Sequence, residues 1–210
     1  MLVTKPVSAF LDELASHSPA PGGGSVAALA GALGAALTSM VCNLTIGKKK
    51  YAEVQGDMKR ILSHAEDMRA QFTSLVDRDT DAFNKVMEAF SLPKETEPQI
   101  ALRRAAINEA TKEAALVPLE VMKHCIDAIA LAQEVAANGN PNSISDAGVS
   151  ALMLHAASEG AALNVKLNLS SLADVEFVGW KTEEVDSLLK TSRMMLEEAM
   201  EIVTERIKKV

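Results

Sequence analysis

The most constraining feature of this sequence is a long stretch without a charged residue. From Val26 to Ile46 the chain contains no Asp, Glu, Lys, Arg or His, and Ala and Gly recur throughout. A helix that is apolar on all sides is normally buried. Small residues at four-residue spacing, such as Ala27, Gly31 and Ala35, let neighbouring backbones approach closely. We therefore predict a central helix with other helices packed tightly around it.

A membrane-spanning helix is the alternative for the same stretch. Its length would suffice, and the basic run 48–50 that follows would suit a cytoplasmic flank. Thr38, Ser39 and Asn43 lie within it, however, and the other long segments are amphipathic and charged. A soluble bundle explains all of these segments together.

The composition favours helix–helix packing. Hydrophobic residues make up 48% of the chain and aromatic residues only 3%, which is unlike an aromatic-rich sheet protein. The net charge of −7 argues against general nucleic-acid binding. Cys42 and Cys125 lie in apolar stretches and are expected to be buried, reduced thiols. Because the N-terminal segment lacks the apolar core of a signal peptide, we expect a cytoplasmic protein.

Helical periodicity extends through most of the chain. We predict helices over residues 7–16, 26–47, 51–92, 97–138, from 143 onward, and 181–210. The expected fold class is all-α: a single-domain bundle of long helices around a buried central helix, spanning residues 1–210. The histidines show no metal-ligand spacing, and no metal site is expected.

A glycine-rich segment precedes the central helix. Exposed N–H groups at a helix start can bind an anion, which would make Gly23, Gly24 and Ser25 ligand contacts. A plain helix-entry loop explains the same residues, because the segment matches neither a dinucleotide-binding nor a Walker motif.

Residues 51–92 contain the clearest packing pattern. Apolar residues recur at alternating four- and three-residue steps, as in a helix-packing seam: Val54, Met58, Ile61, Ala65, Met68, Phe72, Leu75, Ala82 and Val86. Asp79 interrupts this seam, with Asp77 and Asp81 on either side. A carboxylate at an apolar position is costly unless it is paired or used. Either Asp79 is functional, or the helix breaks here and Asp79 caps a new one.

Several residues in the second half of the chain each allow a functional and a structural interpretation. Pro118 should free the carbonyl four residues earlier, and the kink either opens room for a ligand or curves the bundle. Ser143 to Asp146 resembles a capping box, which alone would explain Asp146. Asn164 and Asn168, one turn apart, form either inter-helix hydrogen bonds or ligand contacts. Six residues are predicted to form the buried side of this helix: Val149, Met153, Ala156, Gly160, Leu163 and Leu167.

Six short motifs together resemble a known family. In chain order they are Pro21-Gly22-Gly23-Gly24-Ser25, Leu44-Thr45-Ile46-Gly47-Lys48-Lys49-Lys50-Tyr51, Asp77-Arg78-Asp79-Thr80-Asp81-Ala82-Phe83, Val117-Pro118-Leu119, Gly139-Asn140 with Ser145-Asp146, and Asn164-Val165 with Asn168-Leu169. This set resembles the cyclodeaminase domain of the formiminotransferase-cyclodeaminase family, which also includes stand-alone methenyltetrahydrofolate cyclohydrolases. The resemblance covers nearly the whole chain.

The resemblance implies an all-helical, homodimeric enzyme that binds a tetrahydrofolate derivative and needs no cofactor. The first expected activity is formiminotetrahydrofolate cyclodeaminase, which forms 5,10-methenyltetrahydrofolate and ammonia. The alternative is methenyltetrahydrofolate cyclohydrolase, in which water attacks the same carbon. A helical scaffold without catalytic activity is the alternative of another class, but a scaffold gains nothing from a carboxylate in its seam.

The chemistry asks for acid–base groups and for negative charge near a cationic amidinium. We expect Asp79 and Asp146 to be catalytic, with Asp146 holding the edge of the pterin ring. The lysine run could bind the glutamate carboxylates of folate, or could simply be a solvated helix end. The predicted substrate-binding residues are Gly23, Gly24, Ser25, Lys48, Lys49, Lys50, Asp77, Asn140, Ser145, Asn164 and Asn168.

Overall fold

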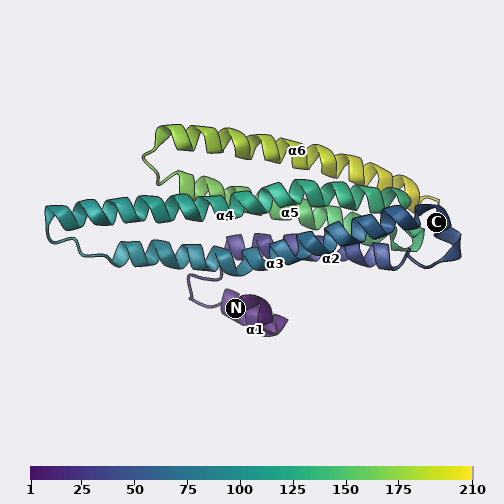
Figure 1. Ribbon diagram of the computed structural model, residues 1–210, viewed down its shortest axis with the longest axis horizontal. Coiled ribbons are helices and arrows are strands. Elements are labelled where there is room, and N and C mark those ends of the chain that lie inside the picture. Colours follow the sequence, from purple (N-terminus) through teal and green to yellow (C-terminus); the bar gives the residue numbers. More distant parts are fainter. Residues whose placement is uncertain (210) are drawn as a thin grey trace.

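The structure, a computed structural model, describes residues 1–209 and is built from helices throughout (Figure 1). The α-helices are α1 (Val7–Leu14), α2 (Gly23–Asn43), α3 (Gln55–Ser91), α4 (Glu97–Asn138), α5 (Ile144–Leu169) and α6 (Val175–Ile207). Three 3-10 helices complete the list: η1 (Leu2–Thr4), η2 (Lys49–Val54) and η3 (Pro141–Ser143). Since these residues contain no strand, the predicted all-α bundle is confirmed.

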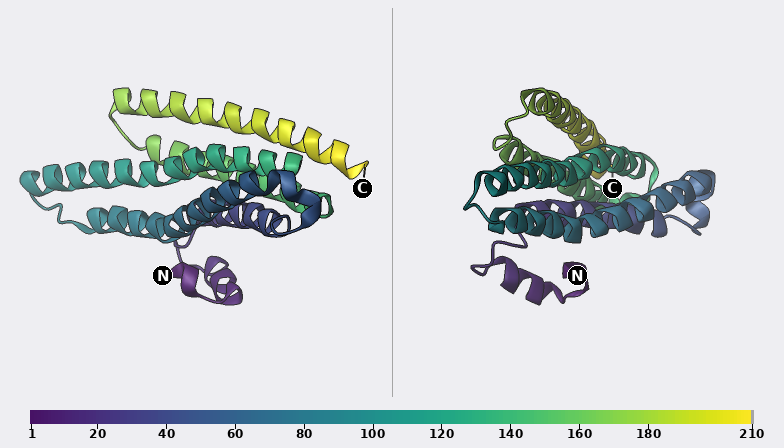
Figure 2. Two further views of the ribbon diagram at one scale, coloured as in Figure 1. Left: turned by 45° about the vertical axis from the view of Figure 1, so that its right-hand side comes forward. Right: turned by 60° about the vertical axis from the view of Figure 1, so that its left-hand side comes forward.

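The five long helices run side by side along the length of the molecule (Figure 1). Helix α2 packs against α3, α4 and α5, and α6 covers α4 and α5. The short α1 lies outside this bundle, beside α2 and α3 (Figure 2), where Phe10 lies near Leu29 and Val76.

Close approach between helices depends on glycine. A Cβ atom at Gly31 would lie 2.5 Å from the ring of Phe72 in α3, and one at Gly34 would lie 2.6 Å from Leu154 in α5. Neither position has room for a side chain, which is the physical reason for the small residues predicted to face neighbouring helices. Ser150 adds a buried hydrogen bond from its Oγ to the carbonyl of Gly34, at 2.7 Å.

Helix α3 confirms the predicted seam. Met58, Ile61, Phe72 and Leu75 are completely buried. The helix is continuous from Gln55 to Ser91, so Asp79 lies in its interior. The alternative in which the helix breaks and Asp79 caps a new one is therefore wrong.

Several helix boundaries differ from the sequence prediction, among them those of α2 and α6. Helix α2 starts at Gly23 and ends at Asn43, so the glycines predicted as a loop form its first turn. Helix α6 starts at Val175, before the predicted Lys181, because the Asp174 side chain accepts a hydrogen bond from the N–H of Phe177 and caps the helix. The predicted end of this helix at Val210 lies outside the described residues.

The predicted buried side of α5 is wrong for the single chain. Leu163 and Leu167 are each 71% exposed, and Val149 is 46% exposed. Helix α2 likewise has one uncovered side, where Leu33 is 50% exposed. By length and composition α2 could span a membrane, but most of it is buried in the bundle. An apolar face shared by α2 and α5 thus remains uncovered.

Candidate active site

A cleft of about 310 Å³ opens at the N-terminal end of α2. It is lined by Pro19, Ala20, Gly22, Gly23, Gly24, Asp79, Thr80, Phe83, Val86, Ala114, Asn164, Leu167 and Asn168. Gly22, with extended backbone, precedes the first turn of the helix. The first N–H groups of a helix lack intrahelical acceptors and carry partial positive charge. The cleft therefore combines amide donors with the carboxylate of Asp79.

Asp79 is held directly against the first turn of α2. The Ser25 hydroxyl donates a hydrogen bond to Oδ2 of Asp79 at 2.9 Å. The same hydroxyl lies 3.2 Å from the Thr80 Oγ1 atom. A Cβ atom at Gly24 would lie only 2.1 Å from Asp79 Oδ1, so a side chain here would displace the carboxylate. The glycine and serine of the predicted loop thus position the predicted catalytic carboxylate.

Burial raises the pKa of Asp79 above that of an ordinary aspartate, because a charged carboxylate is poorly solvated in the bundle. Hydrogen bonds from the side chain and backbone of Ser25 favour the charged form and oppose this rise. A carboxylate with a raised pKa is a stronger base than one in water, which suits proton transfer.

Pro118 explains the position of Asn168. Because proline has no N–H, the carbonyl of Ala114, four residues earlier, loses its intrahelical donor. The Nδ2 atom of Asn168 donates to that carbonyl at 3.0 Å and so joins α5 to α4 at the cleft wall. Asn164 donates similarly to the carbonyl of Gly160 at 2.9 Å. Within residues 1–209 neither asparagine Oδ1 atom accepts a hydrogen bond, and both residues line the cleft.

The lysine run lies at the other end of α2. Lys48, Lys49 and Lys50 are exposed and form no ion pair with any residue from 1 to 209. Asn140, which is only 5% exposed, anchors this end. Its Oδ1 accepts the Tyr51 hydroxyl at 2.8 Å, and its Nδ2 donates to the carbonyl of Leu44 at 3.2 Å. Asn140 therefore holds the lysine segment in place.

Asp146 and Ser145 lie at this same end, in the first turn of α5. Ser143 precedes the helix but makes no capping hydrogen bond with its side chain, so the capping-box explanation for Asp146 is wrong. Ser145 is exposed and Asp146 half-buried. Capping thus no longer accounts for the carboxylate of Asp146.

Asp77 belongs neither to the residues around the Asp79 cleft nor to those near the lysine run. Its Oδ1 accepts a hydrogen bond from the backbone N–H of Leu2, which ties the N-terminal segment to α3. It does not line the cleft that contains Asp79. The structure gives Asp77 a contact that holds the fold together.

The predicted site residues thus form two groups at opposite ends of α2. One group surrounds the cleft: Gly23, Gly24, Ser25, Asp79, Asn164 and Asn168. The other comprises Lys48, Lys49, Lys50, Asn140, Ser145 and Asp146. At 1.5 Å per residue, the 21 residues of α2 separate the groups by about 30 Å. A single chain therefore does not bring them together.

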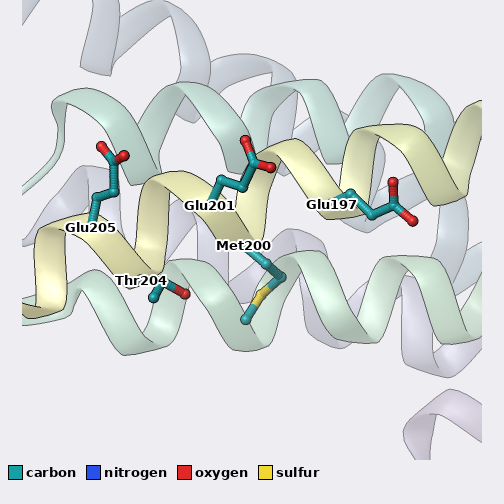
Figure 3. Close-up of a pocket in the computed structure, with 5 residues that line it drawn as sticks. All are labelled: Glu197, Met200, Glu201, Thr204 and Glu205. Atoms are coloured by element: carbon teal, nitrogen blue, oxygen red, sulfur yellow. The ribbon is translucent and has the colours of Figure 1, made fainter.

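Two other depressions differ in charge from the cleft. One, of about 460 Å³, lies on α6, where Glu197, Glu201 and Glu205 stand one turn apart (Figure 3). Three neighbouring carboxylates would repel an anionic ligand. The other, of about 400 Å³, is lined by Arg103 and Arg104 of α4 and by the segment after α5. Arg103 donates to the carbonyl of Phe90 at 3.0 Å, while Arg104 is exposed.

The sequence prediction missed several apolar walls of the cleft. Phe83, Val86 and Leu167 line it although no motif chemistry points to them. Phe83 is one turn after Asp79 on α3, so helical spacing from Asp79 could have identified it. Leu167 could not be identified in this way, because its contact depends on how α5 packs against α2. Within residues 1–209, no three His, Cys, Asp or Glu side chains are close enough together to hold a metal ion.

This chain is similar to known proteins in both sequence and structure. The sequence profile described as Formiminotransferase-cyclodeaminase matches residues 6–187. Methenyltetrahydrofolate cyclohydrolase of Methylorubrum extorquens is 46% identical over 201 residues, covering 96% of this chain and 97% of that protein. Formimidoyltransferase-cyclodeaminase of Sus scrofa is 36% identical over 192 residues, covering 91% of this chain but 36% of that protein. The crystal structure of formiminotetrahydrofolate cyclodeaminase from Thermotoga maritima matches with a TM-score of 0.88 and 30% identity, covering 99% of this chain and 100% of that chain.

Proposed function

Because this chain belongs to the formiminotransferase-cyclodeaminase family of folate one-carbon enzymes, we propose that it hydrolyses 5,10-methenyltetrahydrofolate at the cleft beside Asp79. The single observation that carries this proposal is a half-buried carboxylate with a raised pKa, held by Ser25 at the edge of a cleft. Support for hydrolysis comes from the 46% identity and near-equal length shared with a methenyltetrahydrofolate cyclohydrolase. The sequence alone had favoured the cyclodeaminase reaction.

The substrate carries a positive charge on the amidinium that joins N5, the methenyl carbon and N10. Water attacks this carbon and gives its proton to the Asp79 carboxylate, so that a C–O bond forms. The hydroxyl then releases its proton to solvent as the carbon–oxygen double bond forms and the bond between the carbon and N5 breaks. N5 takes up the proton held by Asp79, and 10-formyltetrahydrofolate leaves. The negative charge of Asp79 also stabilises the cation before attack. One carboxylate therefore serves as base and as electrostatic partner.

The other cleft residues orient the folate. The free amide oxygens of Asn164 and Asn168 can accept N–H groups from the pterin edge. Phe83, Val86 and Leu167 supply apolar contact for the flat ring. Asp146, predicted from the sequence to hold the pterin edge, and Lys48 to Lys50, predicted to bind the glutamate tail, lie at the far end of α2 from this cleft.

Cyclodeamination is the second candidate activity. Its supporting observation is the Thermotoga maritima cyclodeaminase, which matches this chain along its whole length. In that reaction N10 attacks the formimino carbon, and ammonia leaves in place of N5. The same carboxylate can take the proton from N10 and return it to the departing amine. The free cysteines Cys42 and Cys125, both buried, support the proposal of a cytoplasmic enzyme.

The test compares two assays of the purified protein that follow the absorbance of methenyltetrahydrofolate. We expect its absorbance to decay faster with enzyme than without, and the rise in absorbance from 5-formiminotetrahydrofolate to be slower than this decay. A fast rise with no accelerated decay would replace cyclohydrolase by cyclodeaminase. If the protein accelerates neither reaction, both proposals fail and a non-catalytic scaffold becomes the better account.

A further inference from the structure

The Thr80 hydroxyl lies at the cleft, and the proposed reaction assigns it no role. Threonine inside a helix commonly donates its hydroxyl to the backbone carbonyl four residues earlier. Four threonines of this chain do so, over 2.7–3.0 Å: Thr45, Thr73, Thr182 and Thr191. Among residues 1–209 Thr80 forms no bond of this kind, and its Oγ1 lies 3.2 Å from the Ser25 Oγ of α2. The Thr80 hydroxyl is therefore directed across the helix interface towards Ser25.

The Asp79 carboxylate fixes the direction of the bond between the two hydroxyls. An ionised carboxylate only accepts hydrogen bonds, so the Ser25 hydroxyl uses its one proton on Oδ2 of Asp79, at 2.9 Å. Ser25 can then only accept from Thr80. Because Ser25 is 0% exposed, water does not compete for this place. The result is a chain of donors that runs from Thr80 through Ser25 to Asp79.

The same arrangement occurs a second time in the bundle, where it is purely structural. The Ser150 hydroxyl donates to the carbonyl of Gly34 at 2.7 Å, and its Oγ lies 2.9 Å from Thr38 Oγ1. Because a carbonyl only accepts, Thr38 donates to Ser150 here. Both hydroxyls are buried, and the chain joins α2 to α5. At the cleft, the threonine–serine pair ends instead on a group that titrates and that faces a ligand site.

The charge of Asp79 depends on these donors. Among the residues that the structure describes, the cleft walls from the α1–α2 loop, α2, α3, α4 and α5 contain no charged side chain besides Asp79. On its own helix, Arg78 is paired with Glu120 over 2.8 Å, and Asp81 is exposed. Hydroxyl and amide donors therefore stabilise the negative charge, and hydrogen bonds in a chain strengthen one another by polarisation.

We propose that Thr80 is a positioning residue for the proposed reaction: its hydroxyl holds the Ser25 hydroxyl on Asp79, and so fixes the orientation and the charge of the carboxylate in the cleft. The effect on rate rests on the proposed function, whereas the effect on Asp79 itself exists without any substrate. Hydrogen bonds to the ionised form oppose the rise in pKa that burial causes. Loss of the Thr80 hydroxyl should therefore raise the pKa of Asp79 further.

The first test follows the titration of Asp79 in the full chain without folate. In protein labelled with 13C-aspartate, the carboxyl signal of Asp79 is the one that Asp79→Asn removes. Thr80→Val, which replaces the hydroxyl by a methyl group of similar size, should move the midpoint to higher pH by about half a pH unit. Thr80→Ser keeps a hydroxyl and should restore the midpoint. Thr73→Val removes a hydroxyl elsewhere on α3 and should leave it unchanged. An unchanged midpoint in Thr80→Val would overturn the inference.

A double variant tests whether Thr80 acts through Ser25. Ser25→Ala removes the donor to Asp79 and should raise the midpoint more than Thr80→Val does. Once Ser25 is replaced, Thr80 has no link to the carboxylate, so adding Thr80→Val should change the midpoint no further. Equal shifts in both backgrounds would mean that Thr80 influences Asp79 by another route, which overturns the chain. If Thr80→Val does not fold, Thr80→Ala, which needs no additional space, takes its place.

The rate of methenyltetrahydrofolate decay connects the donor chain to function. In Thr80→Val, kcat/KM at neutral pH should fall by about two- to tenfold, the range for one neutral hydrogen bond. The acid limb of its pH profile should move to higher pH together with the titration midpoint. The fall should lie in kcat, because Thr80 holds the carboxylate and not the substrate, and Thr80→Ser should retain the wild-type profile.

Two outcomes separate this inference from the proposed function. A shifted titration of Asp79 with an unchanged rate and pH profile in Thr80→Val would overturn the positioning role. A wild-type chain that accelerates no folate reaction would remove the proposed function, while the titration would still decide whether Thr80 acts on Asp79.

Discussion

Asp79 occupies a seam position of α3 where every neighbour in the pattern is apolar, and this has a consequence for stability. Burial raises its pKa in the folded chain, so folding favours the protonated form. The stabilising effect of that proton is present below the ordinary value of 3.8 and is lost as the pH rises through the raised pKa. At neutral pH the charged carboxylate therefore destabilises the fold.

We predict that Asp79→Asn melts at a higher temperature than wild type at pH 7. The difference should shrink as the pH is lowered towards 3.8, because both proteins then carry a neutral group at this position. Melting curves at several pH values measure the effect, with Asp81→Asn at an exposed position as control. A lower melting temperature for Asp79→Asn at pH 7 would show that the carboxylate is structural.

Gly24 allows a second test of how the Asp79 carboxylate is positioned. A methyl group there would lie 2.1 Å from Asp79 Oδ1, whereas one at Gly23 would lie 3.4 Å from the nearest atom, Nδ2 of Asn164. Gly24→Ala should therefore displace the carboxylate and lower kcat/KM on the order of a hundredfold. Gly23→Ala should have a much smaller effect. Equal rates in the two variants would argue against Asp79 as the acting group.

Helices α4 and α5 are joined because Pro118 leaves the Ala114 carbonyl without an N–H donor from its own helix. Asn168→Ala should leave the Ala114 carbonyl unsatisfied and cost about 1–3 kcal/mol of unfolding free energy. In a Pro118→Ala background the helix supplies its own N–H, so the same change should cost much less. Unfolding of the two single variants and the double variant gives the coupling energy. Additive effects would mean that the proline does not create the need for Asn168.

The elements themselves were largely predictable, because helical periodicity is local. The α3 seam and the full extent of α4 follow from spacing and from breakers such as Pro93. The first turn of α2 could not be predicted from spacing, because glycine favours loops. Only the neighbouring Asp79 explains why Gly24 is needed there. The exposed side of α5 was misjudged because an apolar stripe does not show whether the rest of the same chain packs against it. The helix predicted over 26–47 already separates the glycines from the lysines, but spacing along the motifs does not show at which end of α2 Asp79 and Asp146 lie.

At the scale of the whole molecule, no step of the proposed reaction requires a metal or redox group. Water is the nucleophile, and a carboxylate takes its proton. We therefore expect prolonged treatment with EDTA, followed by removal of the chelator, to leave the rate of methenyltetrahydrofolate decay unchanged. A loss of activity that Zn²⁺ or Mg²⁺ restores would require a metal-dependent mechanism.

The cleft beside Asp79 is the centre of this account, and one rate comparison tests it most directly. Methenyltetrahydrofolate decay is measured at saturating folate for wild type and Asp79→Asn, with circular dichroism to establish that both are folded. We expect wild type to accelerate the decay and Asp79→Asn to be slower by about a hundredfold or more. A folded Asp79→Asn protein with the wild-type rate would contradict it.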